Sequence, residues 1–164
     1  SSTTQYATVV VPTNLLTDYA KFTVTVDPQN TVQESNETNN SVLYQVEVTP
    51  PVVDLAVNAA DQTHSPTTPK PNQSVTIVAH ITNSGNVAVR NVKVRFLLGA
   101  QTIGEKTISY IGPNRTESSR LYWKVPHDAQ GTVTIQIIAD PDNAIQEANE
   151  TNNAATHNVP VATN

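Results

Sequence analysis

Apolar and polar residues alternate in short runs along this chain, and Pro, Gly and Asn residues separate the runs. A period of two is typical of β-strands with one buried face, and no useful stretch has the period of an amphipathic helix. In the second part of the chain we predict strands at 53–58, 74–83, 89–98, 101–109, 116–125, 132–139 and 155–161. These short strands predict an all-β fold, an immunoglobulin-like seven-stranded antiparallel β-sandwich.

The phase of each run predicts which side chains face the core. The predicted inward residues are Val75, Ile77, Ala79, Ile81, Val92, Val94, Phe96, Leu98, Leu121, Trp123, Val125, Val133, Ile135 and Ile137. Trp123 is the single tryptophan, and its apolar phase favours a core position over an exposed binding platform.

A polar segment occurs twice, at 27–40 and at 140–153, with ten of fourteen positions identical. The fourteen residues before each copy share no identical position in the same alignment, which places the copies 113 residues apart. This spacing predicts a tandem repeat. A loop that persists while its strands change uses its side chains for a specific purpose, either capping its own backbone or binding a ligand.

Residues 1–49 align only with the last three strands of the following unit. We predict strands at 7–11, 21–26 and 42–48, with Phe22, Val24, Val26, Tyr44, Val46 and Val48 pointing inward. We therefore expect a partial sandwich at 1–49 and a complete one at 50–164. Three strands alone leave an apolar face and an unpaired edge. Two explanations are open: the first unit is part of a longer array, or strands of a neighbouring chain complete it.

The composition favours an extracellular or cell-surface protein of a bacterium or archaeon. The chain has no Cys, only 14% charged residues, and no Met, so we expect Ser1 to be a processed end. Five Asn-x-Ser/Thr sequons are candidate glycosylation sites: Asn36, Asn39, Asn72, Asn114 and Asn149.

Charge and motif patterns exclude several classes of function. The net charge is −5 and the Lys and Arg residues are scattered, which argues against nucleic-acid binding. No apolar run approaches the length of a membrane span. The histidines have neither metal-ligand spacing nor a nucleophile motif nearby, and His157 takes the inward position of Tyr44 in the other unit. We expect no enzyme activity.

The second unit resembles the CARDB family of cell-adhesion-related domains, which are repeated in bacterial and archaeal surface proteins. The resemblance covers 52–162, and its last third also fits 5–48. It is carried by Asp54-Leu55-Ala56-Val57, by 75–85 ending in Asn83-Ser84-Gly85, by Trp123, and by Asp140-Pro141-Asp142-Asn143 through Glu147, Asn149, Glu150 and Asn152-Asn153. It implies a non-catalytic spacer or adhesion module. Pro71-Asn72 departs from it, because the family commonly has a Gly-containing turn there.

The repeated loop is rich in the oxygen ligands that Ca²⁺ prefers. The candidate calcium ligands are Asp27, Asn30, Glu34, Glu37, Asn39, Asp140, Asn143, Glu147, Glu150 and Asn152. The alternative is a self-capped loop, in which Asn30 and Asn143, each with Gln three residues on, would cap one helical turn. The same residue types serve either purpose, so both remain open.

These patterns predict a structural or adhesive module of a cell-surface or extracellular filament protein. Its sandwiches would pack head to tail, with neighbouring copies or adjacent repeats as partners. The alternative is an accessory polysaccharide-binding module of a secreted hydrolase, for which Tyr110 and Tyr122 are the candidate surface aromatics. Surface glycans are candidate partners in either case.

Overall fold

The computed structural model describes residues 4–8, 10 and 19–163. The chain divides into two compact units, Ser1–Pro51 (unit 1) and Val52–Asn164 (unit 2). Within the described residues the regular structure is antiparallel β-strand together with one short 3-10 helix. The predicted all-β class is therefore confirmed.

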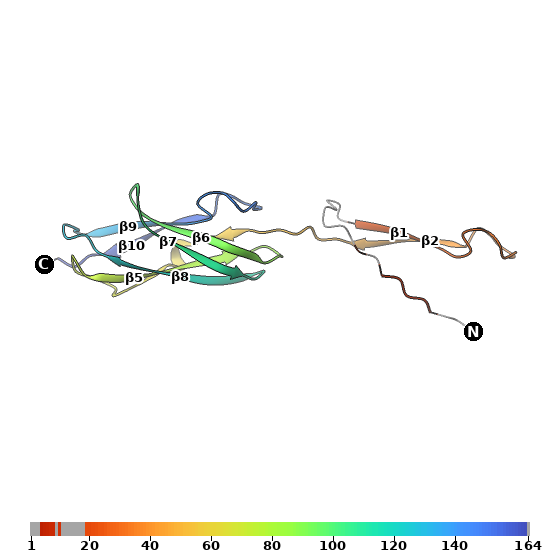
Figure 1. Cartoon of the computed structure of the whole chain (residues 1–164), viewed down its shortest axis with the longest axis horizontal. Helices are drawn as coiled ribbons and strands as arrows, with labels where there is room; N and C mark the ends of the chain where they lie inside the picture. The colour runs from red at the N-terminus through yellow and green to blue at the C-terminus, as the bar shows by residue number, and fades with distance from the viewer. Residues whose placement is uncertain (1–3, 9, 11–18, 164) are drawn as a thin grey trace. The chain divides into compact units, whose positions relative to one another are not determined.

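Unit 2 is a β-sandwich of two four-stranded antiparallel sheets, whose strands lie in two layers in Figure 1. In one sheet β5 pairs with β8 and with the short strands β3 and β4, and the other sheet has the order β10-β9-β6-β7. The elements are β3 (Leu55–Ala56), η1 (Ala59–Asp61), β4 (Thr63–Ser65), β5 (Ser74–Asn83), β6 (Val89–Leu98), β7 (Gln101–Ile111), β8 (Arg115–Lys124), β9 (Thr132–Ala139) and β10 (Ala154–Pro160).

The core of unit 2 lies between the two sheets and follows the alternation of the sequence. Every second residue of β5 is buried, because successive side chains point to opposite faces of a strand. All the predicted inward residues are buried except Leu98, Trp123 and Val133, which are partly buried. Trp123 and Val133 pack against the core, so the core position of Trp123 is confirmed.

The strand count of unit 2 differs from the prediction of seven, since residues 52–163 form eight strands. The additional strand is β4, whose residues Thr63, His64 and Ser65 pair with Val78, Ile77 and Thr76 of β5. The segment around β4 is rich in proline and lies outside the seven strands that the sequence predicts. Its pairing with β5 is a long-range contact that no local pattern encodes.

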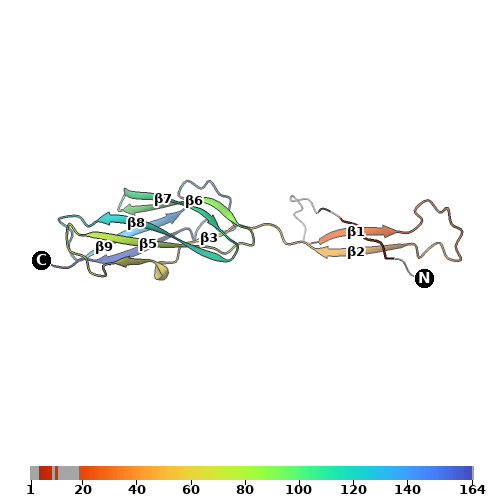
Figure 2. The same ribbon diagram turned by 60° about the horizontal axis from the view of Figure 1, so that its bottom comes forward.

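Unit 1 contains a two-stranded antiparallel ribbon of β1 (Tyr19–Thr25) and β2 (Ser41–Glu47), joined by the loop 27–40 (Figure 2). The predicted third strand at 7–11 does not form at residues 7, 8 and 10, and residues 9 and 11 lie outside the described part.

The predicted inward side chains of unit 1 are not buried. Val24, Val26, Tyr44 and Val46 are 50%, 64%, 56% and 49% exposed, and Phe22 and Val48 are only partly buried. The alternation itself was predicted correctly, but the described residues of unit 1 form no second sheet that packs on the ribbon. An apolar face is buried only where another layer covers it.

Candidate functional site

The repeated loop of unit 2 runs from Asp140 to Asn153 and caps its own backbone. One carboxylate oxygen of Asp140 accepts a hydrogen bond of 2.7 Å from the Ile145 N–H. Asp140 and Asn143 have positive φ angles of 44° and 49°, which Asp and Asn tolerate better than most residues. No helical turn forms, so the predicted capping role of Asn143 is wrong, and Asp140 makes the cap instead.

The rest of this loop is held by two further side chains. The Glu150 carboxylate accepts a hydrogen bond of 2.9 Å from the Glu147 N–H. The Asn149 side-chain oxygen accepts bonds of 3.0 Å from the N–H and 2.7 Å from the hydroxyl of Thr151. Short polar side chains that bond nearby backbone in this way stabilise turns.

The loop 27–40 of unit 1 repeats this network. Asp27 accepts hydrogen bonds from the backbone of Thr31 and Val32 at 3.0 and 2.7 Å. Glu37 accepts from the Glu34 N–H at 2.8 Å, and Asn36 accepts from the Thr38 N–H at 2.9 Å. Asn30 has a positive φ and caps no helical turn, so that prediction is also wrong. Self-capping is therefore what both copies of the loop do.

In unit 2 the loop also holds the first strand of the sandwich. A carboxylate oxygen of Glu147 accepts a hydrogen bond of 2.5 Å from the Leu55 N–H in β3. The side-chain amide of Asn152 donates to Asp54 at 3.1 Å. We call Glu147 and Asn152 the strand clamp.

Two backbone hydrogen bonds reinforce the strand clamp. The Ala148 N–H donates to the Val53 carbonyl at 2.9 Å, and the Val57 N–H donates to the Asn152 carbonyl at 3.0 Å. The loop thus lies along β3 and supplies hydrogen-bond partners to the residues just before and just after it. A polar loop that borders a two-residue strand in this way replaces the ladder hydrogen bonds that the strand is too short to form.

The carboxyl group of Glu147 has an unusual electrostatic position. Burial raises its pKa to about 7, and the negative charges of Glu150 and Asp140 act in the same direction. The hydrogen bonds from Leu55 and Asn153 lower the pKa but do not outweigh burial. Glu147 therefore changes its charge near neutral pH.

The corresponding residues of unit 1 are Glu34 and Asn39, 113 positions earlier in the sequence. In the described part of unit 1, neither side chain makes a hydrogen bond, and no strand occupies the place that β3 takes in unit 2. The self-capping half of the loop is thus present in both units, and the strand clamp is engaged only in unit 2.

A sequence model of the CARDB family matches residues 1–43 and 52–157, which is most of the chain. The chain belongs to the CARDB family. This confirms the resemblance to the CARDB family seen in the sequence.

Several solved structures are similar to this CARDB chain, and each matches roughly two thirds of its length. The CARDB domain of a Pyrococcus furiosus protein, in complex with di-metal ions, is 27% identical, with a TM-score of 0.59 over 70% of this chain and 97% of that one. A domain of a Methanosarcina acetivorans protein, named as a presumed cell surface protein, is 26% identical, with a TM-score of 0.58 over 69% and 95%. A Geobacter metallireducens protein is 31% identical, with a TM-score of 0.52 over 63% and 93%. No curated protein matches the chain.

The metal ions of the Pyrococcus relative make the calcium prediction worth testing against the geometry. Ca²⁺ takes six to eight oxygen ligands. In this CARDB chain the carboxylates of Asp27, Asp140, Glu37 and Glu150 instead face backbone N–H groups. Residues 4–8, 10 and 19–163 contain no group of three or more His, Asp or Glu residues placed to hold a metal. The loops do not fit the ion as they are arranged, and calcium stays a prediction.

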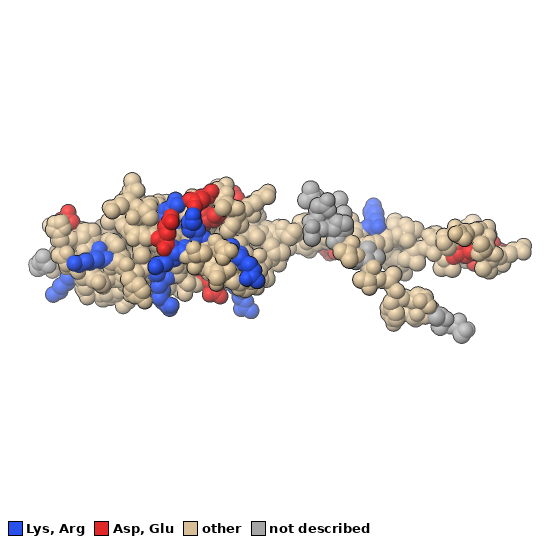
Figure 3. All heavy atoms as spheres, viewed as in Figure 1, with Lys and Arg blue, Asp and Glu red and all other residues tan. Residues whose placement is uncertain are grey.

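Asp142 ties the CARDB loop to β6, a strand of the same sheet as β9 and β10. Its carboxylate forms ion pairs with Lys93 and, at 2.9 Å, with Arg95, and Arg95 also contacts Glu105 at 2.5 Å. The hydrogen bond from Lys93 and then that from Arg95 lower the pKa of Asp142. Basic and acidic side chains are intermixed on the face of unit 2 seen in Figure 3. In the other copy of the loop Gln29 takes the position of Asp142.

The predicted surface residues are accessible. The five sequon asparagines are all exposed, and glycosylation stays a prediction: Asn36, Asn39, Asn72, Asn114 and Asn149. Tyr122 is 75% exposed and Tyr110 44% exposed, but they lie on strands of different sheets, β8 and β7. The Arg90 guanidinium lies 5.0 Å from the centre of the Tyr110 ring.

Two features escaped the sequence analysis. Asn83, which is fully buried, accepts a hydrogen bond of 3.0 Å from the Gly85 N–H and donates one of 2.8 Å to the Val87 carbonyl. His157 is buried as expected, but its ring also bonds the ring of His64 on β4 at 2.7 Å. Burial and the His64 charge lower the pKa of His157. A local signal for Asn83 existed in the Asn-Ser-Gly turn, whereas nothing local links the two histidines.

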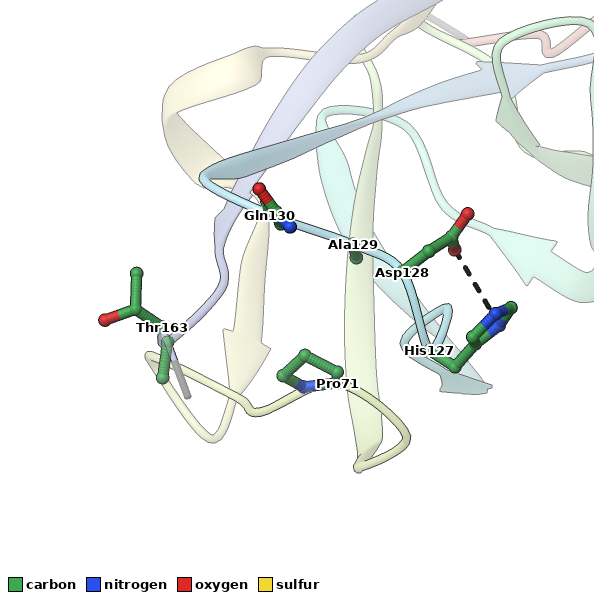
Figure 4. A pocket seen from close by; sticks show the side chains of 7 residues that line it. Pro71, His127, Asp128, Ala129, Gln130 and Thr163 are labelled. Carbon is green, nitrogen blue, oxygen red and sulfur yellow. Dashed lines mark ion pairs between the residues drawn. The ribbon is translucent and has the colours of Figure 1, made fainter.

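One surface pocket of about 330 Å³ opens beside the loop that follows β8 (Figure 4). His127 and Asp128 line it and form an exposed ion pair at 3.8 Å. The remaining lining is mainly apolar or amide, and an exposed pair of this kind has no partner that would orient it for catalysis.

No helix of the described residues is long and apolar enough to cross a membrane.

Proposed function

We propose that this chain is a non-catalytic structural module of a cell-surface or extracellular filament protein. Its tandem, immunoglobulin-like sandwiches provide length and contacts between neighbouring molecules. Membership of the CARDB family and the similarity to a domain of a presumed cell surface protein support an extracellular setting.

The observation that carries the mechanical part of this proposal is the strand clamp. The polypeptide enters unit 2 through Val52 and β3, which would be the first elements to bear tension from unit 1. Asn86 accepts a hydrogen bond of 2.7 Å from the Val52 N–H, and Glu147 holds Leu55 at 2.5 Å. The start of the sandwich is thus fastened by side chains from two separate loops. Such fastening is expected of a module that must not unravel from its end.

The test is single-molecule pulling of the full chain from its two ends. We expect one cooperative unfolding event for unit 2, with an unfolding force that falls in Glu147→Ala. The matched control is Glu34→Ala, which changes the equivalent residue of unit 1, where Glu34 holds no strand of the described part of the chain. An unfolding force that is the same in Glu147→Ala and the parent would contradict the mechanical role.

A second candidate function, polysaccharide binding, is favoured by Tyr122 alone. Its side chain is 75% exposed on β8, and exposed aromatic rings stack on sugars. Tyr122→Ala would abolish retention of the chain on an insoluble polysaccharide such as cellulose or chitin. If Tyr122→Ala is still retained, or if the parent is not retained at all, polysaccharide binding through Tyr122 is contradicted and the structural role is the function that remains.

A further inference from the structure

We propose that His64 and His157 form a binding site for a transition-metal dication such as Zn²⁺ at one edge of the unit 2 sandwich. This inference goes beyond the proposed function and does not depend on it. Three observations lead to it: the strands that carry the two rings, the ring nitrogens that face each other, and the backbone partner that orients His64.

The two histidines extend from edge strands of different sheets. Among the described strands β4 pairs with β5 alone, and β10 is the outer strand of the sheet β10-β9-β6-β7. His64 lies opposite Ile77, and His157 lies opposite Ile135. Directly opposed residues share a face of the sheet, and both isoleucines are fully buried, so both rings point into the space between the sheets. The pair therefore lies where the two layers meet at one edge.

The ring nitrogens of the pair are directed at each other. His64 Nδ1 lies 2.7 Å from His157 Nε2, and the rings meet edge to face at 68° with their centres 4.9 Å apart. His64 Nε2 lies 3.0 Å from the Thr67 carbonyl oxygen, which can only accept a hydrogen bond, so this nitrogen carries a proton. In the neutral His64 ring, Nδ1 therefore presents a lone pair toward His157.

A backbone carbonyl that binds the far nitrogen is a common outer partner of a metal-binding histidine. It fixes the tautomer and the orientation of the ring, and it makes the nitrogen that faces the metal more basic. Thr67 supplies this partner to His64. Burial, and then the His64 charge, lower the pKa of His157, which favours the neutral ring that a metal requires.

Metal binding requires one proton to change its position. Because His64 Nδ1 has a lone pair, the proton between the rings of the neutral pair is carried by His157 Nε2. When a metal binds, His157 carries this proton on Nδ1 instead, so both facing nitrogens donate a lone pair and no proton is lost. Tetrahedral coordination at about 2.0–2.1 Å places two nitrogens about 3.3 Å apart, so the rings separate by roughly 0.6 Å.

The ligand set selects the class of metal. Imidazole nitrogen suits Zn²⁺, Cu²⁺ and Ni²⁺, whereas Ca²⁺ and Mg²⁺ take oxygen ligands. The chain has no Cys that would compete for such ions. Within the described residues no third His, Asp or Glu side chain joins the pair into a larger group. Water would complete the coordination, and His64 is only partly buried, which leaves the open positions of the ion accessible.

A bound ion would link the two sheets of unit 2. β4 is three residues long and belongs to one sheet, and β10 belongs to the other. A ligand that binds only the folded state lowers the unfolding equilibrium constant by mass action. Free Zn²⁺ at about a hundred times its dissociation constant is therefore expected to lower the unfolding constant about a hundredfold.

The test is a titration of the untagged full chain with ZnCl₂ near neutral pH, followed by isothermal titration calorimetry. The chain is first freed of metal with EDTA and dialysed. We expect one zinc ion per chain, and a melting temperature that rises with ZnCl₂ but not with MgCl₂ at the same concentration. Absence of zinc binding would overturn the proposal and leave the pair with its hydrogen bond only.

Two variants of the full chain locate the ion. His64→Ala removes a ligand from a partly buried position, so the sandwich should stay folded. Loss of an outer partner alone weakens metal binding by about 10- to 100-fold, so loss of a ligand should weaken it by at least about tenfold. His127→Ala is the matched control, since His127 is an exposed histidine beside Asp128, and it should leave the affinity unchanged. Zinc binding that survives His64→Ala, or that disappears in His127→Ala, would overturn the proposal.

Nitrogen NMR of the histidine rings tests the geometry without a mutation. In the metal-free chain we expect His64 and His157 to carry their protons on Nε2. Zinc should move the proton of His157 to Nδ1 and leave that of His64 in place, because the Thr67 carbonyl holds it. A His157 ring that keeps its proton on Nε2 at saturating zinc would contradict the site.

Discussion

The carboxylate of Glu147 accepts a hydrogen bond from the backbone N–H of Leu55, which lies 92 residues earlier in the chain. The bond joins the loop before β10 to the first strand of the same sandwich. Leu55 is fully buried, so its N–H group has no water to replace the carboxylate. The first strand of unit 2 therefore depends on a side chain from near the other end of the unit.

Glu147→Ala is expected to destabilise unit 2. It leaves the buried Leu55 N–H without an acceptor, and an unsatisfied buried donor costs about 1–3 kcal/mol. Urea unfolding of the full chain, followed by the fluorescence of Trp123, measures the change. Glu34→Ala is the matched control and should leave the midpoint unchanged. Equal midpoints for Glu147→Ala and the parent would show that the bond contributes nothing.

The raised pKa of Glu147 predicts a pH dependence of stability. Its pKa is about 7 in the folded chain and 4.5 ordinarily, so the folded state binds the proton more tightly. Stability contributed by this group is therefore lost as the pH rises from about 4.5 to about 7, and it changes little above that. His157, whose pKa is lowered, contributes with the opposite sign below its ordinary value of 6.5.

Comparing the parent with Glu147→Gln separates the effect of the Glu147 carboxyl group on the pH dependence of stability from the effect of His157. The amide keeps an oxygen for the Leu55 N–H, while its NH2 group replaces the carboxylate oxygen that accepts from the Asn153 NH2. The Asn153 amide must therefore turn over to present its oxygen, which is buried without a partner in the parent. We expect thermal melting of the parent to fall by a few degrees, relative to the variant, between about pH 5 and about pH 8. Parallel curves for the two proteins would contradict the assignment.

Gly85→Ala should be among the most damaging single changes in unit 2. A Cβ atom at this position would lie 2.1 Å from the Val52 carbonyl oxygen, which is backbone and has little room to move. Overpacking of this kind costs about 1–3 kcal/mol. The control is Gly112→Ala, whose nearest neighbour would be the flexible Arg115 side chain at 3.4 Å. Both are compared by urea midpoints, and an unchanged midpoint for Gly85→Ala would disprove the close approach.

Removal of metal ions by a chelator distinguishes a self-capped loop from a calcium site. Because the Asp140 carboxylate is engaged by the Ile145 N–H, we expect the melting temperature to be the same in excess EDTA and in excess calcium chloride. A melting temperature that rises with calcium, and does so in the parent but not in Asp140→Ala, would establish the metal site instead.

Much of unit 2 could be predicted from the sequence because its strands have a strong period of two. The alternation along β5 predicted its buried face, and the same argument placed Trp123 against the core. β4 was missed because three residues beside a proline-rich segment carry no useful period. The exposed face of the ribbon was mispredicted for a related reason. Alternation says which side chains share a face, but not whether a second sheet covers it.

The repeated loop, too, could be predicted from the sequence only in part. Its composition limited the choices to self-capping or calcium, because Asp, Asn and Glu oxygens suit both N–H donors and metal ions. The three-dimensional arrangement shows the N–H donors in place around Asp140 and Glu150. The composition could not separate the two, since the direction of a carboxylate depends on the backbone around it.

The sequence by itself determined most strands and the core face of unit 2, the repeated loop and the family, because these depend on periodicity and on motifs read along the chain. Only the tertiary structure decided that Glu147 holds Leu55, that His64 meets His157, and that no strand of the described residues is held by Glu34. The physical reason is separation along the chain. A hydrogen bond between residues 92 or 93 positions apart depends on how the whole unit folds, and no local pattern records it.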